Sequence, residues 1–350
     1  MFNKKRKNMK KLNLFLFVLL FQFVFVYCNA DSGEADTIYV ATWNVENLFD
    51  TVDEPGINDE DFTPSGENEW TEERLKQKFE KLAEVIKYMH NGEGPDLLGV
   101  QEVEHQSLLN EMNEEYLDEK YKIVYAESLD KRGIDNGLFY NSDLFELLSF
   151  DTLRVDLADG WLTRYILYAN LEIKDSQQKL HVFVNHWPSR SGGKEKSEPN
   201  RIAAALVLKN YTDKIFEKDV NANIVILGDF NDDPTDVSIY EILKAQELEC
   251  SDPGINYFYN TSLEKFKEGT GTYLYRGGWN MLDQIIVSRS LVESNDLDYV
   301  CDSFEIIKPD FMINKEGKYA GSAIRTFGGK KYIGGYSDHY PTGAKFTYKK

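Results

Sequence analysis

The sequence predicts a single α/β domain built on mixed β-sheets. Short apolar segments typical of buried strands alternate with amphipathic helical segments along the whole chain. No linker rich in Gly, Pro or Ser divides the 350 residues, and this length is ample for one large core. Because continuously apolar strands are usually buried on both faces, we expect helices to cover the sheets.

Each element is predicted from its local pattern. Helical spacing of apolar residues predicts helices over 73–90 and 201–216, with Thr71 as N-cap of the first and Pro199 just before the second. A short helix is expected near 237–245, and the long segments 50–70 and 253–280 are expected to be loops of functional interest. Strands are predicted over 37–43, 96–101, 138–140, 145–154, 164–173, 180–185, 223–227, 284–287 and 344–348.

The first thirty residues have the layout of a signal peptide. Residues 1–11 are basic, residues 12–26 are apolar and uncharged, and small residues precede a cleavage site after Ala30. This apolar stretch is too short to span a bilayer. We therefore expect a domain over 31–350 that is secreted or periplasmic. A lipoprotein anchored through Cys28 ranks second, because Tyr27 is bulkier than the residue that usually precedes a lipidated cysteine.

The remaining chain is acidic. The protein has 40 Lys and Arg against 59 Asp and Glu, and six of the basic residues lie in the first thirty positions, which contain no acid. Beyond Ala30 the formal charge is therefore −25. This charge disfavours a tight, charge-driven nucleic-acid binder, but it is compatible with an enzyme that meets phosphate through a metal ion and a few arginines. Two cysteines remain, Cys250 and Cys301, and the sequence leaves open whether they pair.

Polar side chains lie at the ends of the predicted strands. Any one of them is more commonly a helix cap or a turn residue, but that explanation does not account for six strand ends with complementary groups. Because sites in layered α/β folds gather at strand ends, we expect these residues to converge in one cleft. The residues are Asn44, Glu46, Glu102, Asn185, His186, Asp229, Asn231, Asp283, Asp338 and His339.

Three of these residues suit a metal ion. Asn44, Glu102 and Asp338 supply the oxygen ligands that Mg²⁺ prefers, and Mg²⁺ is commonly held by one or two carboxylates together with substrate phosphate. Mn²⁺ and Ca²⁺ are alternatives that the sequence does not separate from it.

The other residues suit the chemistry of water attack on a phosphoester. His339 with a carboxylate partner makes a general base. Asp229 and Asn231 lie two residues apart, so one can orient a water molecule while the other donates a hydrogen bond to a phosphate oxygen. His186 can donate to a phosphate oxygen or to the leaving group. Together these groups predict metal-assisted hydrolysis.

With these residues in these positions, the chain resembles a known family, the endonuclease/exonuclease/phosphatase superfamily. The resemblance is strongest to its deoxyribonuclease-like, secreted bacterial members. The matching motifs occur in the family's order and cover nearly the whole chain beyond Ala30. The combination of GDFN, SDH and QEVE is specific. The motifs are WNVENLFD (43–50), LLGVQEVE (97–104), RGIDNGLFYN (132–141), TRYILYANL (163–171), VNHWPSRSGG (184–193), ILGDFNDDP (226–234), GTYLYRGGWNMLDQIIVS (271–288) and YSDHYPTGAKF (336–346).

The resemblance implies a four-layer α/β sandwich of two packed mixed β-sheets flanked by helices. It implies that Asp283 is the carboxylate partner of His339 and that Arg164 contacts a substrate phosphate. It leaves open which of the two histidines, His186 or His339, is the acid and which is the base. It assigns no role to Arg132 or Asp135, which lie in one of the shared motifs.

Three functions are weighed. The first is a Mg²⁺-dependent nuclease that hydrolyses DNA or RNA, acts as a monomer and has no stable protein partner; basic residues near the motifs favour it. The second is a phospholipid or small-molecule phosphoesterase that recognises a head group, for which aromatic residues between 257 and 279 would form a rim at the membrane. Such aromatic residues more commonly pack under a long loop, and they can also stack on bases. The third is a non-catalytic binding protein, which the intact set of acids and histidines disfavours.

Overall fold

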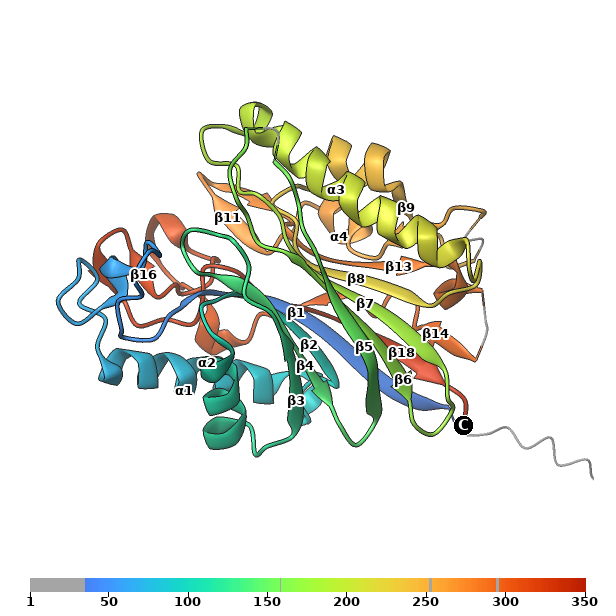
Figure 1. The fold of residues 1–350 in the computed structure, drawn as a ribbon, viewed down its shortest axis with the longest axis horizontal. Helices are drawn as coiled ribbons and strands as arrows, with labels where there is room; N and C mark the ends of the chain where they lie inside the picture. The colour runs from blue at the N-terminus through green and yellow to red at the C-terminus, as the bar shows by residue number, and fades with distance from the viewer. Residues whose placement is uncertain (1–34, 158, 252–253, 294–295) are drawn as a thin grey trace, which may run out of the picture. The chain divides into compact units, whose positions relative to one another are not determined.

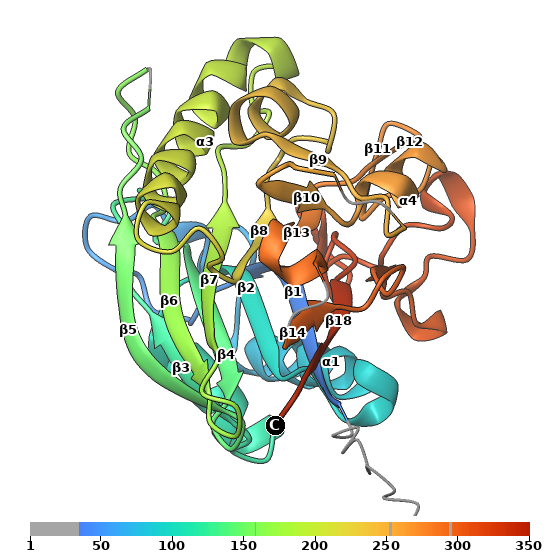
Figure 2. The same cartoon turned by 90° about the vertical axis from the view of Figure 1, so that its right-hand side faces the viewer.

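The computed structural model describes residues 35–157, 159–251, 254–293 and 296–350. The predicted signal peptide lies outside the described residues. Within them, two large β-sheets pack face to face, with one long helix on the outer face of each (Figure 1). The view in Figure 2 shows the same layers from the side. The four-layer α/β sandwich is thereby confirmed.

The first sheet has seven strands among the described residues, in the order β14-β18-β1-β2-β4-β3, with β15 also paired to β18. Strands β1 and β2 are parallel, and the other pairs are antiparallel. The strands are β1 (Asp36–Leu48), β2 (Leu97–Val103), β3 (Tyr121–Tyr125), β4 (Asp135–Asn141), β14 (Leu297–Tyr299), β15 (Glu305–Ile306) and β18 (Thr342–Tyr348).

The second sheet also has seven strands in the described part of the chain, in the order β5-β6-β7-β8-β13-β10-β9. Pairs β7–β8 and β9–β10 are parallel, and the others are antiparallel. The strands are β5 (Phe145–Leu153), β6 (Ile166–Ile173), β7 (Lys179–His186), β8 (Ile224–Asp229), β9 (Ala245–Glu247), β10 (Phe258–Asn260) and β13 (Asp283–Ser288). Two small hairpins complete the set: β11 (Tyr273–Tyr275) with β12 (Gly278–Asn280), and β16 (Phe327–Gly328) with β17 (Lys331–Tyr332).

The helices are α1 (Glu72–Tyr88), α2 (Gln106–Glu111), α3 (Lys194–Phe216) and α4 (Leu263–Lys267). Thr71 caps α1 as predicted, because its side chain accepts a hydrogen bond from the backbone of Arg74. Helix α3 begins seven residues earlier than predicted and contains Pro199. The 237–245 segment forms a π-helical turn, Ser238–Leu243, followed by β9.

Three apolar cores separate the four layers within the described chain. One packs α1 against the first sheet and includes Trp43 and Phe79. One lies between the sheets and includes Val184 and Leu227. The third packs the second sheet against α3 and includes Phe183 and Ala204. Burying each sheet on both faces fixes the register of its strands, and hence which side chains reach the strand ends.

Cys250 and Cys301 form a disulfide, with Cα atoms 5.9 Å apart. A search of the described residues for a helix with the length and hydropathy of a membrane span found none.

Candidate active site

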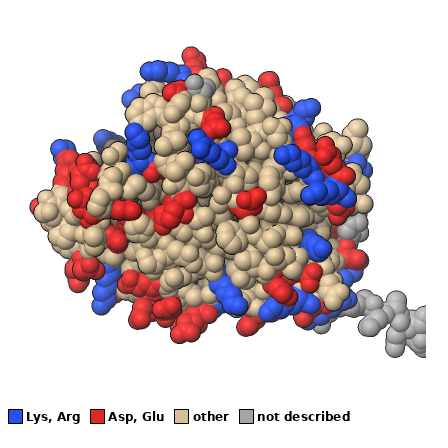
Figure 3. Space-filling view, in the orientation of Figure 1, with Lys and Arg blue, Asp and Glu red and all other residues tan. Residues whose placement is uncertain are grey.

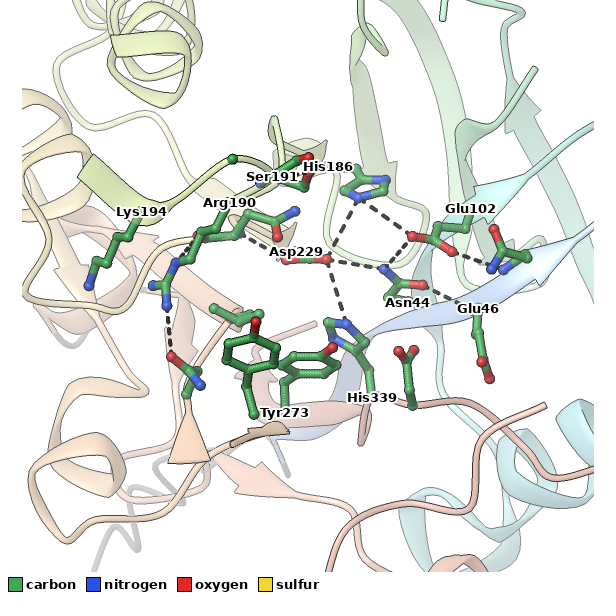
Figure 4. Close-up of a pocket in the computed structure, with 18 of the residues that line it drawn as sticks. Asn44, Glu46, Glu102, His186, Arg190, Ser191, Lys194, Asp229, Tyr273 and His339 are labelled. Atoms are coloured by element: carbon green, nitrogen blue, oxygen red, sulfur yellow. Dashed lines mark hydrogen bonds and ion pairs between the residues drawn. The ribbon is translucent and has the colours of Figure 1, made fainter. Parts of the chain in front are cut away.

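A cavity of about 810 Å³ opens where the parallel strand pairs β1–β2 and β7–β8 end, and we call it the catalytic cavity. Asn44 and Glu102 reach it from the ends of β1 and β2, while His186 and Asp229 reach it from the ends of β7 and β8 (Figure 4). Asp338 and His339 enter just before β18. Residues separated by up to 295 positions are thus brought to one place.

Asn44, Glu102 and Asp229 form a hydrogen-bonded row across the cavity floor. The Asn44 amide donates to Glu102 Oε1 at 3.2 Å and to Asp229 Oδ2 at 3.1 Å. Asn44 Oδ1 and Glu102 Oε2 accept backbone hydrogen bonds from Glu46 and Asn47, both at 2.9 Å. The Asn44 amide therefore links a strand of the first sheet to Asp229 of the second, and these hydrogen bonds fix the orientation of both carboxylates.

The backbone is strained where it carries these groups. Five non-glycine residues lining the cavity have left-handed φ angles: Glu46 at 54°, Asn47 at 51°, Glu102 at 66°, Asn231 at 51° and Arg276 at 51°. The register of β1 and of β2 shifts at the same points. Such conformations cost free energy and persist where surrounding structure holds them, often at functional sites.

His339 and Asp283 form a buried pair on one wall of the cavity. Nδ1 of His339 lies 2.7 Å from Oδ2 of Asp283, which is fully buried. The other ring nitrogen, Nε2, faces Asp229 Oδ2 at 4.0 Å. Burial alone would lower the pKa of His339, but Asp283, Asp229 and Asp338 together raise it well above the ordinary value. Tyr273 packs against the His339 ring, with centroids 4.7 Å apart.

His186 lies on the opposite wall and faces two carboxylates. Its Nε2 is 3.8 Å from Glu102 Oε1 and 3.7 Å from Asp229 Oδ2. Burial, aided by nearby Arg164, lowers the pKa of His186 well below its ordinary value, so the ring is neutral. Burial also raises the pKa of Asp229 to about 7, despite the opposing charge of His339. The two histidines thus sit on either side of Asp229 with opposite electrostatic environments.

Asp338 belongs to a charged group at the edge of the cavity. Its Oδ2 lies 3.6 Å from Arg325. Burial, together with the negative charge of Asp338, raises the pKa of Glu46. Glu46 Oε2 accepts a hydrogen bond from the backbone of Thr326 at 2.6 Å. Behind them, Lys78 of α1 donates to Thr326 Oγ1 and to the backbone oxygen of Tyr336, both at 2.7 Å.

Four basic residues line the cavity, but two of them are already paired. Arg190 contacts Asp233 and Asp236 at 2.9 and 3.1 Å, and Lys194 lies 2.7 Å from Asp236. Arg132 and Arg276 keep more of their charge available: Arg132 has only a 3.6 Å contact with Asp130, and Arg276 lies over the Tyr275 ring. On the face shown in Figure 3, basic residues occur in small groups among acidic ones. Any attraction for an anionic substrate therefore comes from individual cations in the cavity, such as Arg132 and Arg276, and not from the charge of the whole surface.

Arg164 lies deeper than the resemblance implied. Its guanidinium is buried, donates to Asp130 Oδ2 at 2.9 Å and to the backbone oxygen of Trp187 at 2.8 Å, and does not line the catalytic cavity in the described structure. Direct contact with a substrate phosphate stays a prediction. Asn231 does line the cavity; its amide donates to the same Trp187 oxygen at 3.0 Å.

The sequence alone indicated no catalytic role for Glu46, Asn47, Tyr273 or Asn280, all of which line the cavity. Tyr273 was expected only as one of the aromatic residues between 257 and 279. Glu46 was visible as a polar residue after a strand, whereas Tyr273 and Asn280 gave no separable signal because their long loop folds back as a hairpin. The aromatic residues between 257 and 279 do not share one surface: Phe258 and Tyr259 are buried in the core, while Tyr273 and Tyr275 line the cavity.

The donor set fits a divalent cation. Glu46, Glu102 and Asp338 line the cavity together with Asn44, and their side-chain oxygens are hard ligands suited to Mg²⁺ or a similar ion. Asp229, Asp283 and His339 form a second group, whose ligand atoms lie within 4.8 Å of one another. Several carboxylates close together in a confined space repel one another, and a bound cation relieves this repulsion.

A four-layer α/β sandwich that gathers acids, amides and two histidines in one cavity defines a class of protein, the metal-dependent phosphoester hydrolases. The chain belongs to the endonuclease/exonuclease/phosphatase family, whose model matches residues 39–347. Members of this family are phosphoester hydrolases that depend on divalent metal ions. The family resemblance drawn from the motifs is thereby confirmed.

Solved structures agree with this assignment at the level of the fold. An endonuclease/exonuclease/phosphatase family protein from Bacteroides thetaiotaomicron is 17% identical with a TM-score of 0.57, covering 90% of this chain and 99% of its own. A mannosyl-6-phosphatase from the same organism is 17% identical with a TM-score of 0.56, covering 88% and 99%. TDP2 from Caenorhabditis elegans is 16% identical with a TM-score of 0.55, covering 89% and 97%. The comparison with curated proteins found no significant match.

Proposed function

We propose that this protein is a metal-dependent phosphodiesterase that hydrolyses DNA or RNA by attack of water. The observation that carries the proposal is the position of His339. Its Nδ1 is held by buried Asp283 at 2.7 Å, and its Nε2 faces Asp229 across a 4.0 Å gap in the catalytic cavity. A histidine oriented by a carboxylate and aimed at a second acid is suited to move a proton from an attacking water.

Each neighbouring residue has a role in this reaction. Asn44, Glu102 and Asp338 would hold the divalent cation, which supplies positive charge beside the phosphate oxygens. Asp229 Oδ2 and His339 Nε2 orient the water between them, and the neutral form of His339 accepts the proton of the water at Nε2. The charge of the bound cation would favour this neutral form, because it opposes the carboxylates that raise the pKa of His339. Asp283 keeps the ring in place and stabilises the imidazolium. His186 and Asn231 donate hydrogen bonds to the phosphate or to the leaving oxygen, where negative charge develops.

The cavity favours a nucleic-acid substrate over a phospholipid. Arg132 and Arg276 supply local positive charge, and Tyr273 and Tyr275 supply ring faces beside it. A membrane rim would need the aromatic side chains of 257–279 on one exposed surface, whereas Phe258 and Tyr259 are buried.

The test is a substrate panel with and without chelator. We expect the purified protein to cleave single-stranded DNA or RNA with Mg²⁺ or Mn²⁺, and the activity to be lost with EDTA and in His339→Ala. His90→Ala is the matched control, because His90 stacks on Tyr39 and does not line the catalytic cavity. Release of phosphocholine or inositol phosphate from vesicles, without cleavage of nucleic acid, would overturn the substrate class.

We further propose that residues 1–30 direct the chain out of the cytoplasm. The Cys250–Cys301 disulfide supports this location, because disulfides persist in oxidising compartments. Fractionation of cells that express the full chain, with detection of the processed protein, tests it.

A further inference from the structure

A second depression adjoins the catalytic cavity, and we call it the side depression. Its volume is about 570 Å³, and the same four residues line both: Arg132, Ser189, Ser191 and Gly192. The two spaces therefore adjoin at these residues, and a substrate chain lying in one can extend past them into the other. Its remaining lining comes from the loop between β5 and β6, from Pro188 after β7, and from the first turns of α3.

An exposed tryptophan forms one wall of the side depression. Trp161 is 64% exposed, and Lys131 Nζ lies 5.4 Å from its ring centroid. The loop that carries it is fixed to α3 because Asp159 accepts hydrogen bonds from the backbone of Trp161 at 3.1 Å and from Asn200 Nδ2 at 2.7 Å. Large aromatic side chains held in an exposed position beside cations provide stacking surfaces for bases.

The floor of the side depression has polar groups with no protein partner. Thr163 is 5% exposed, and its Oγ1 makes no hydrogen bond within the described structure. Arg164, also buried, has an unsatisfied Nε among the described atoms. Both residues line the depression. Because buried polar groups are normally hydrogen-bonded, these two indicate an acceptor that the protein itself does not supply.

The charge around this floor suits an anion. Lys196 and Arg132 line the depression, and Lys131 lies at its edge. Helix α3 starts beside it at Lys194, and no side chain in the described chain caps its N-terminus. Backbone N–H groups at a helix start and nearby cations both favour a phosphate. Asp159, the one acid that lines the depression in the described structure, keeps its negative charge, but the cations Lys196, Arg132 and Lys131 outnumber it.

We propose that the side depression binds the nucleotide next to the scissile phosphodiester, with its base stacked on Trp161 and its phosphate near Thr163 and Lys196. This inference rests on the proposed phosphodiesterase function and narrows the substrate to a single-stranded chain that carries a phosphate beyond the reacting one. A substrate with one isolated phosphodiester fills only the catalytic cavity.

The experiment compares two substrates in three variants. The substrates are a single-stranded oligonucleotide and bis(4-nitrophenyl) phosphate, which has no flanking nucleotide. Trp161→Ala is expected to lower kcat/KM on the oligonucleotide by about 5- to 150-fold, the range of one lost base stack, and to leave bis(4-nitrophenyl) phosphate turnover at the wild-type rate. Trp161→Phe keeps a ring and is expected to retain most oligonucleotide activity. Lys196→Ala is expected to reduce the salt dependence of oligonucleotide binding by about 0.7 in log–log slope.

The matched control is Tyr319→Ala. Tyr319 is 53% exposed with Lys318 over its ring at 4.7 Å, like Trp161 with Lys131, but it lines neither space. Equal turnover of both substrates by wild type and Trp161→Ala would overturn the inference and leave the proposed function intact. An equal loss on both substrates would also overturn it, as would a Trp161→Ala defect confined to binding of anionic phospholipid vesicles. If wild type hydrolyses neither substrate, the proposed function itself fails.

Discussion

Nδ1 of His339 and Oδ2 of Asp283 lie 2.7 Å apart in a region closed to solvent. The two residues are 56 positions apart, and each is held separately: Asp283 by its place at the start of β13, and His339 by the hydrogen bond from Trp43 Nε1 to its backbone oxygen at 3.0 Å. Their pairing is therefore part of the fold and does not depend on substrate. Because this pairing orients the imidazole before substrate binds, its contribution to turnover can be tested by changing Asp283 alone.

Replacing Asp283 by Asn should lower turnover strongly without unfolding the protein. The amide has nearly the same shape, but it removes the charge that stabilises the imidazolium and permits the wrong tautomer of the ring. We expect kcat to fall by about 10²- to 10⁴-fold with little change in KM. Steady-state kinetics and a melting curve measure both effects. Full activity of Asp283→Asn across neutral pH would show that the pair has no part in the reaction.

Glu102→Gln should weaken metal binding and turnover together. Glu102 is the carboxylate at the centre of the cavity floor, where it contacts Asn44, the Asn47 backbone and His186. Removing its charge lowers the attraction for a divalent cation. Titration calorimetry with Mn²⁺ is expected to show a weaker dissociation constant, and the Mg²⁺ concentration for half-maximal activity is expected to rise in parallel.

The acid Glu305 supplies the control for this prediction. Glu305 accepts a hydrogen bond from the Tyr39 hydroxyl at 2.6 Å, does not line the catalytic cavity, and lies outside the groups of acids and histidines in the described chain that could hold a metal ion. Glu305→Gln is expected to leave the affinity for Mn²⁺ unchanged. The same affinity in wild type and Glu102→Gln would remove Glu102 from the metal site.

The positions of strands, and so the gathering of their ends, follow from the sequence because apolar periodicity decides which face each strand buries. Asp229 and His186 were found this way, since each directly ends an apolar run. The start of α3 was predicted too late because a proline usually lies in the first turn of a helix. In this structure the helix begins at Lys194, and Pro199 lies in its second turn.

Contacts made by long loops were beyond the sequence for a different reason. Lys78 reads as one more charged residue on an amphipathic helix, yet it is 1% exposed and is bonded to a segment some 250 residues away. Tyr273 lies in the short hairpin of β11 and β12, and Trp161 lies in a loop. Neither segment has a periodic pattern, so nothing local indicates which way these side chains point. Such residues acquire their surroundings only from tertiary packing.

Removing the buried cation Lys78 should destabilise the protein, and removing Glu46 as well should recover part of the loss. Burial lowers the pKa of Lys78 to about 8 and raises that of Glu46 to about 7, and each charge favours the ionised form of the other. Lys78→Met leaves Glu46 without its cation, a change worth about 3–5 kcal/mol of unfolding free energy. Urea denaturation of the two single variants and the double variant measures the coupling.

Lys81→Met is the control on the same helix, because Lys81 is partly exposed, donates to the Tyr336 hydroxyl at 3.1 Å, and lies over the Tyr336 ring and 3.5 Å from Glu84. We expect a change of about 1 kcal/mol or less there. A double variant of Lys78 and Glu46 whose loss equals the sum of the two single losses would show that the two charges are independent.

Asp135 should make the stability of the protein fall as the pH rises. Its carboxylate is 2% exposed and accepts hydrogen bonds from the Ser128 backbone and from Tyr125, yet burial raises its pKa to about 7 from an ordinary value of 3.8. Because the folded state holds this proton more tightly than the unfolded state, the stabilisation is complete below pH 3.8 and is lost as the pH rises towards 7.

Asp135→Asn lacks this titration, so its stability relative to wild type should rise by about 2–3 kcal/mol between pH 5 and pH 8. Chelator-treated protein unfolded in urea at several pH values measures it, with the exposed Asp143→Asn as control. Parallel pH profiles for wild type and Asp135→Asn would contradict the prediction.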